Sequence, residues 1–188
     1  MPLTVPPPRT PFDGSAARWY RRELGWAATD GSPVRLATGL RFDVLDLPVD
    51  AGAAVLRRVA RTGPVALMGR RMRLLVAAGS AEELPGLLDW LEWRGVDLDL
   101  TALGAGGAIT APPPPGRPGA QGAAVWLRPP VPGREEPLPA LTGLGGSGGA
   151  PDLVRLVDTA ATECHRVRLL RTARTNARRT TDQPLAFS

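Results

Sequence analysis

Residues 42–48 read Phe-Asp-Val-Leu-Asp-Leu-Pro, an apolar run that carries two acids and ends on Pro48. Such a run is typical of a strand buried on both faces of a sheet, and we expect a strand over residues 41–47. Side chains two apart on a strand share a face, so an Asp-x-Asp ending could direct two carboxylates at a pair of divalent cations. Pro48 stands where the second acid would be and cannot ligate a metal. Asp43 does not replace it, because three residues of separation place it on the opposite face from Asp46.

The composition bounds the class of protein. The chain has 188 residues, 23 basic and 18 acidic side chains and a formal charge of +5, and every basic residue is an arginine. Arginine pairs bidentately with phosphate oxygens, but its scatter along the chain equally fits a GC-rich genome, which is the preferred interpretation. The length and a hydrophobic content of 43% predict one soluble globular domain with flanking segments.

The single cysteine, Cys164, excludes an internal disulfide, and one neighbouring histidine, His165, is too little for a tetrahedral zinc site. A catalytic dyad of these two residues is disfavoured, because adjacent positions on a helix face different directions. No stretch approaches the roughly 20 apolar residues that cross a bilayer, and the N-terminus lacks the apolar core of a signal peptide. We therefore expect a cytoplasmic protein with no membrane contact.

Composition also divides the chain. We expect a disordered Pro-rich tail over residues 1–14, a domain over 15–140, a Gly-rich linker over 141–151, and a basic amphipathic helix and tail over 152–188. The domain pattern predicts an α+β fold, with a mixed β-sheet and helices packed on it. Helices are expected at residues 15–24, at 51–61 after Asp50 as cap, and from about Pro85. Further strands are expected at residues 64–68, 71–77, 96–101, 107–111 and 123–127.

The C-terminal segment is amphipathic and then basic. Apolar residues recur at helical spacing from Leu153 to Val167, which predicts a helix beginning after Pro151. No acid lies between Cys164 and Thr181, where six arginines occur: Arg166, Arg168, Arg171, Arg174, Arg178 and Arg179. This run predicts weak, sequence-independent contact with the phosphates of DNA or RNA. The alternative is a docked helix whose charged end is only solvated.

Several short motifs follow one another in an order that resembles a known family. They are Gly-Trp at 25–26, Ala-Thr-Gly at 37–39, the 42–48 run, and segments 63–76, 99–114 and 125–130. Over about residues 15–140 the chain resembles the N-terminal domain of bifunctional DNA primase/polymerases, of the archaeo-eukaryotic primase class, as found in actinobacteria. The resemblance implies a primase/polymerase-like fold. The chain looks like a truncated member, because only residues 27–36 join the first two motifs.

The resemblance implies a site that this chain retains in part. Catalytic members of the family carry an Asp-x-Asp pair for two divalent ions, a histidine that contacts nucleotide phosphates, and a third acid before a Gly-rich turn. Asp46 matches the first acid and Asp99, with Asp97 on the same strand face, matches the third. Pro48 replaces the second acid, and Met72 stands at the histidine position. Asp46 and Asp99 are therefore expected to be vestigial ligands, with Mg²⁺ or Mn²⁺ as cofactor only if activity is retained.

Three functional hypotheses follow. The preferred one is a catalytically inactive relative that binds nucleic acid or nucleotide in an accessory role, since losing one positioned electrostatic group costs about a hundredfold in rate. Arg70, Arg71 and Arg73 are its candidate phosphate contacts beside the C-terminal arginines, with a solvated edge as the alternative. The second hypothesis is residual metal-dependent primase or polymerase activity with Asp43 or Asp97 recruited. The third is an interaction module that binds a protein partner.

Overall fold

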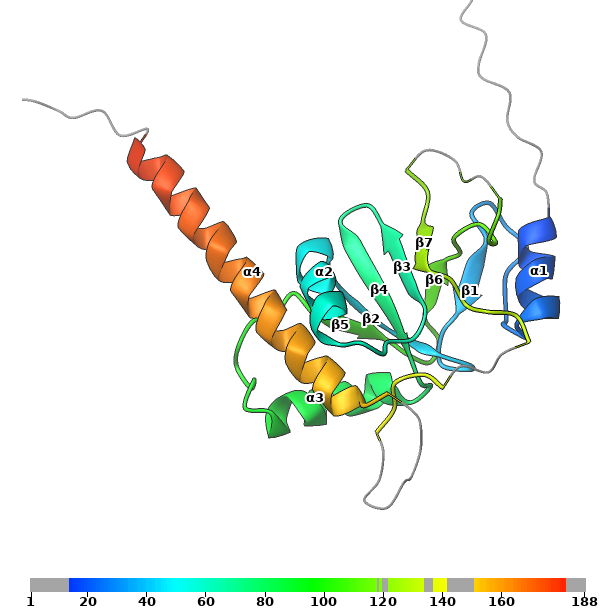
Figure 1. The fold of residues 1–188 in the computed structure, drawn as a ribbon, viewed down its shortest axis with the longest axis horizontal. Helices are drawn as coiled ribbons and strands as arrows, with labels where there is room; N and C mark the ends of the chain where they lie inside the picture. Colours follow the sequence, from blue (N-terminus) through cyan, green and yellow to red (C-terminus); the bar gives the residue numbers. More distant parts are fainter. Residues whose placement is uncertain (1–13, 118, 120–121, 134–136, 142–150, 182–188) are drawn as a thin grey trace, which may run out of the picture.

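The computed structural model describes residues 14–117, 119, 122–133, 137–141 and 151–181. In this part of the chain four helices pack on two antiparallel sheets, so the α+β class expected from the sequence is confirmed (Figure 1). The helices are α1 (Ser15–Glu23), α2 (Val49–Arg58), α3 (Ser80–Trp90) and α4 (Leu153–Thr181). Most of the expected Pro-rich tail and Gly-rich linker lies outside the described residues.

The main sheet has the strand order β5-β2-β4-β3-β7, and a two-stranded sheet pairs β1 with β6. The strands are β1 (Arg35–Ala37), β2 (Asp43–Pro48), β3 (Val65–Met68), β4 (Arg71–Val76), β5 (Thr101–Leu103), β6 (Ala108–Thr110) and β7 (Val125–Arg128). Every pair of neighbouring strands is antiparallel, so the expectation of a mixed sheet was wrong. The reason is that β2 and β3, joined through α2, run in the same direction, but β4 lies between them.

Strand β2 is the centre of the packing. All six of its residues are buried, as the apolar run predicted, and its two faces belong to two different cores. Leu45 and Leu47 join a large core with α2, α3 and α4, whereas Val44 joins a smaller, aromatic core with Tyr20 and Phe42. The sheet is therefore covered by three helices on one face and by α1 with the small sheet near the other (Figure 1).

Three boundaries differ from the sequence-based expectation. Helix α2 begins at Val49 with Pro48 as its N-cap, so Asp50 lies in the first turn instead of capping the helix. Helix α3 begins at Ser80 and includes Pro85. An acid from a neighbouring strand supports its start, because the buried carboxylate of Asp43 accepts a hydrogen bond from the Ala81 amide at 2.9 Å. Strand β5 begins at residue 101, later than the strand expected at 96–101.

The end of α3 carries a conformational cost. Glu92 has a φ of 63°, and the amide of Trp93 donates to the Leu88 carbonyl at 2.8 Å, which is the pattern of a left-handed helix terminus. This left-handed conformation is unfavourable for residues other than glycine, because the Cβ atom crowds the following carbonyl oxygen. We expect Glu92→Gly to raise the free energy of unfolding by about 1 kcal/mol in urea titrations. An equal or lower stability than the parent protein would show that the Glu92 side chain makes a compensating contact.

The two halves of helix α4 differ, because the first half packs into the core and the second half projects away from it. Its first half buries apolar side chains against α2 and α3, among them Leu153, Leu156 and Cys164. The amide of Val154 donates to the Asp152 carboxylate at 2.9 Å, so this acid caps the helix. The second half extends beyond the sheet (Figure 1), and there Leu169 and Leu170 are 56% and 52% exposed. None of the described helices combines the length and the apolar composition that a bilayer crossing requires.

Candidate functional site

The two acids that the resemblance assigns to a metal site are brought together, and an arginine lies between them. Arg71 donates from Nε to the Asp46 carboxylate and from Nη1 to the Asp99 carboxylate. Its Nη2 donates to the Asp46 backbone carbonyl at 3.0 Å, and Arg73 Nε donates to the second Asp46 carboxylate oxygen at 3.0 Å. Both oxygens of Asp46 are therefore occupied by guanidinium groups.

The strand register explains this cluster. Asp46 on β2 lies directly opposite Arg73 on β4, and Arg71 is two residues away on the same face of β4. Met72 lies on the other face, buried against Gly52, as the alternation predicted. Burial alone would lower the pKa of Arg71, but its hydrogen bonds to Asp46 and Asp99 outweigh burial and raise that pKa. Arg71 stays charged and acts as the counter-ion of both acids.

This geometry does not fit a pair of divalent cations. A cation at Asp46 would lie beside Arg71 and Arg73, whose charges repel it, and would have to displace their hydrogen bonds. The described residues also contain no cluster of three or more His, Cys, Asp or Glu side chains that could hold a metal ion. The residue at the expected histidine position, Met72, is turned into the core. The local chemistry is that of an ion-pair network that is buried at Asp46 and partly exposed at Arg71 and Asp99.

The arginines of α4 extend this network outward. Arg168 pairs with Asp97 at 2.9 Å, and Arg171 approaches Asp99 at 3.7 Å and Asp50 at 3.8 Å. These pairs involve side chains that are about half exposed or more, so each contributes only about 0 to 1 kcal/mol to stability. The acids hold the arginines weakly and leave much of each guanidinium in contact with water.

The remaining predicted contacts lie apart from the acid cluster. Arg174 is exposed on the projecting half of α4 and forms no ion pair with any described residue. Arg178 and Arg179 belong to the same helix, but their side chains lie outside the described part of the structure. Arg70 is exposed at the β3–β4 turn, where its carbonyl accepts the Val49 amide at 2.9 Å. Among the candidates whose side chains are described, five pair with acids and two, Arg70 and Arg174, are exposed without an ion pair to a described residue; the paired ones are Arg71, Arg73, Arg166, Arg168 and Arg171.

A further group joins the predicted Arg166 to three residues that the sequence reasoning missed: Arg57, Arg58 and Glu163. Arg57 and Arg58 at the end of α2 lie beside Glu163 and Arg166 of α4 and line a groove of about 500 Å³. The Glu163 side chain is only 4% exposed and pairs with Arg58 at 3.0 Å and with Arg166 at 3.7 Å. The i,i+3 spacing of Glu163 and Arg166 was a signal for the second pair. Nothing in the local sequence signalled the contact between helices.

The two residues of the disfavoured dyad point in different directions. Cys164 is buried and its Sγ lies 3.7 Å from the Asp99 carbonyl oxygen, whereas the His165 ring lies 5.8 Å from that of Trp93. Burial, and secondarily the Asp99 charge, raises the pKa of the Cys164 thiol to about 12. The thiolate, which is the reactive form, is thereby suppressed in the folded protein.

This burial predicts an unreactive thiol. At pH 8 in native buffer we expect Cys164 to react with a disulfide reagent such as DTNB at least about a hundredfold more slowly than in urea. The thiol pKa is higher in the folded chain than the value of about 8.5 expected in the unfolded chain. The thiol therefore does not lower the free energy of unfolding below about pH 8.5. As the pH rises from there towards 12, the unfolded chain ionises first and the free energy of unfolding falls. Cys164→Ala should lose less stability than the parent between pH 8 and pH 10. Rapid labelling in native buffer would contradict the buried position.

Comparisons of the chain with protein-family models, with curated proteins and with solved structures found no significant match. The resemblance to primase/polymerases rests on the sequence motifs described above.

Proposed function

We propose that this protein binds nucleic acid through the arginines of α4 and is a catalytically inactive, primase/polymerase-like protein with an accessory role. The observation that carries the proposal is the second half of α4. Residues 165–181 contain six arginines and no acid, and the C-terminal part of this segment projects beyond the sheet (Figure 1). A projecting cationic helix can approach a polyanion without a matching cleft, and each neutralised phosphate releases condensed counterions.

The ion pairs at the base of the projection are compatible with this role. Arg168 and Arg171 contact carboxylates through pairs that are weak because they are solvated. Phosphate oxygens accept the same forked hydrogen bonds as carboxylates. Exchanging a carboxylate for a phosphate therefore costs little, and Arg174 needs no exchange at all.

The Asp46 cluster supports the catalytically inactive part of the proposal. Metal-dependent phosphoryl transfer requires cations that neutralise charge on the phosphates. Here the positive charge next to Asp46 and Asp99 belongs to Arg71. Unlike a metal ion, a guanidinium group cannot coordinate a nucleophile or activate it. In this proposal Arg71 is a structural link between β2, β4 and the segment before β5. A reducing, cytoplasmic location is part of the proposal, because the single cysteine of the chain, Cys164, is free and buried.

The test compares two ligands that have the same bases but differ in whether their backbone carries charged phosphates. A fluorescent 20-nucleotide single strand of DNA and a peptide nucleic acid of the same base sequence, which has no phosphates, are each titrated with the full chain at about 50 mM salt. We expect the protein to raise the anisotropy of the labelled DNA strand and to leave that of the uncharged analogue unchanged. Equal binding of both would mean that bases are recognised, and binding of neither would refute the proposal.

A further inference from the structure

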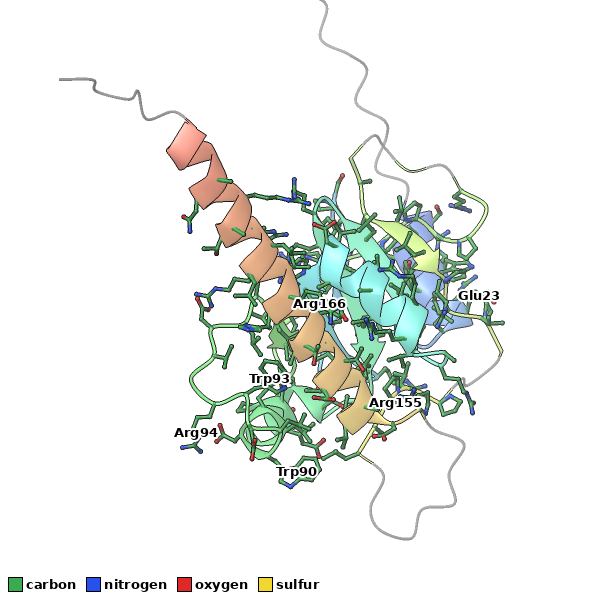
Figure 2. The ribbon with its side chains drawn as sticks, turned by 60° about the vertical axis from the view of Figure 1, so that its left-hand side comes forward. Glu23, Trp90, Trp93, Arg94, Arg155 and Arg166 are labelled. Carbon is green, nitrogen blue, oxygen red and sulfur yellow. The ribbon has the colours of Figure 1, made fainter. Side chains whose placement is uncertain are left out.

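The groove between α2 and α4 contains two arginines that are fixed by one buried acid. Glu163 is 4% exposed at its side chain, whereas Arg58 and Arg166, which pair with it, are each 55% exposed. Figure 2 shows Arg166 on α4 beside α2. A guanidinium has five donors in a rigid fork, so pairing with one carboxylate oxygen leaves several donors free. Both residues line the groove.

Burying the carboxylate of Glu163 costs free energy unless the carboxylate is paired with a cation. A buried carboxylate pays a desolvation penalty that an ion pair only partly repays. Its Oε1 makes no hydrogen bond of good geometry within the described residues, although Arg58 lies 3.0 Å away. The acid therefore holds the two arginines near each other without saturating them. Two cations held in this way are organised in advance for an anion, which lowers the entropic cost of binding.

The rest of the groove is compatible with a phosphate group. Arg57 is exposed and forms no ion pair with any described residue, and Ala54, Val167 and Leu170 supply the apolar part of the lining. Asp50, the second acid of the lining, approaches Arg171 at 3.8 Å. The groove thus holds three arginines, of which two are tied to a single buried negative charge.

We propose that Arg58 and Arg166, positioned by Glu163 and assisted by Arg57, form a phosphate-binding clamp in the α2–α4 groove. The proposal extends the nucleic-acid function proposed above, because the clamp would bind one backbone phosphate beside the projecting arginines. A free phosphate compound offers the same chemistry. The two sources of phosphate are separated by testing an oligonucleotide and inorganic pyrophosphate independently.

The decisive variant is the double substitution Arg58→Lys with Arg166→Lys. It preserves the net charge and leaves Glu163 paired, so the fold is maintained, but it removes the two forked guanidinium groups. Arg155→Lys is the matched control, since Arg155 is an exposed arginine nearer the start of α4 (Figure 2). The parent, the double variant and the control are titrated with a labelled single strand by anisotropy and with pyrophosphate by calorimetry.

The clamp predicts about a tenfold loss of affinity in the double variant for each ligand that the parent binds, and no change in the control. Arg57→Ala, which unpairs no buried charge, should lose about threefold. If the parent binds pyrophosphate with this pattern but not the oligonucleotide, the clamp holds a small phosphate compound and the nucleic-acid proposal fails. If the double variant matches the control, or if the parent binds neither ligand, the clamp is overturned.

Discussion

Arg71→Met lowers the free energy of unfolding by about 3 kcal/mol in urea titrations, the largest stability effect that we expect of an exchange in the acid cluster. The substitution removes hydrogen bonds to the Asp46 carboxylate, the Asp46 carbonyl and Asp99 at once. It also leaves the Asp46 carboxylate, whose side chain is 11% exposed, with Arg73 as its one remaining ion-pair partner among the described residues. Breaking one side of a buried ion pair costs more than the pair contributes, because the other charge stays desolvated.

A neighbouring arginine provides the control. Arg70→Met, at the exposed turn, should change stability by no more than about 0.5 kcal/mol. The double variant Arg71→Met with Asp46→Asn should recover part of the loss, because the desolvated charge is removed with its partner. Equal stabilities for the two single variants would mean that the Arg71 cluster is a solvated surface rather than a structural link.

Neutralising the outer arginines of α4 produces the largest expected effect on binding. Replacing Arg174, Arg178 and Arg179 by glutamine removes three positive charges while retaining good helix formers. For single-stranded DNA, three lost phosphate contacts reduce the salt slope by about 2 and the affinity by about a hundredfold near 0.1 M salt. Anisotropy titrations of a labelled 20-nucleotide strand measure both quantities, and circular dichroism confirms that α4 still forms.

The matched control changes the same net charge elsewhere. Arg22, Arg61 and Arg155 are exposed and lie outside the projecting segment, and their triple replacement by glutamine should alter affinity by less than about threefold. A comparable loss in both triple variants would show that net charge alone governs binding. No loss in either would remove α4 from the binding surface.

The sequence predicted the fold where local patterns dominate. The continuous apolar run predicted β2, and the strands expected at residues 64–68 and 71–77 match β3 and β4. Strand alternation accounts for the opposite directions of Met72 and its neighbouring arginines. The helix after Pro151 follows from the helical spacing of its apolar residues. Strand β5 was misplaced, because only residues 101–103 pair with β2, and this pairing is a tertiary contact that the local pattern does not show.

The site was less predictable because it depends on contacts between distant elements. Alternation placed Arg71 and Arg73 on one face, but their pairing with Asp46 depends on the β2–β4 register. The approach of Asp99 to Asp46 was expected only through the family resemblance. The groove of Arg58, Glu163 and Arg166 arises from the packing of α2 on α4, which no local pattern specifies. Buried acids and their partners are set by tertiary structure.

The most direct test of nucleic-acid binding is the dependence of single-stranded DNA affinity on salt for the full chain, measured by anisotropy between about 50 and 300 mM. If the arginines of α4 neutralise four or five phosphates, the logarithm of the association constant falls against the logarithm of salt with a slope of about −3. A slope near zero, or no binding at the lowest salt, would contradict the account.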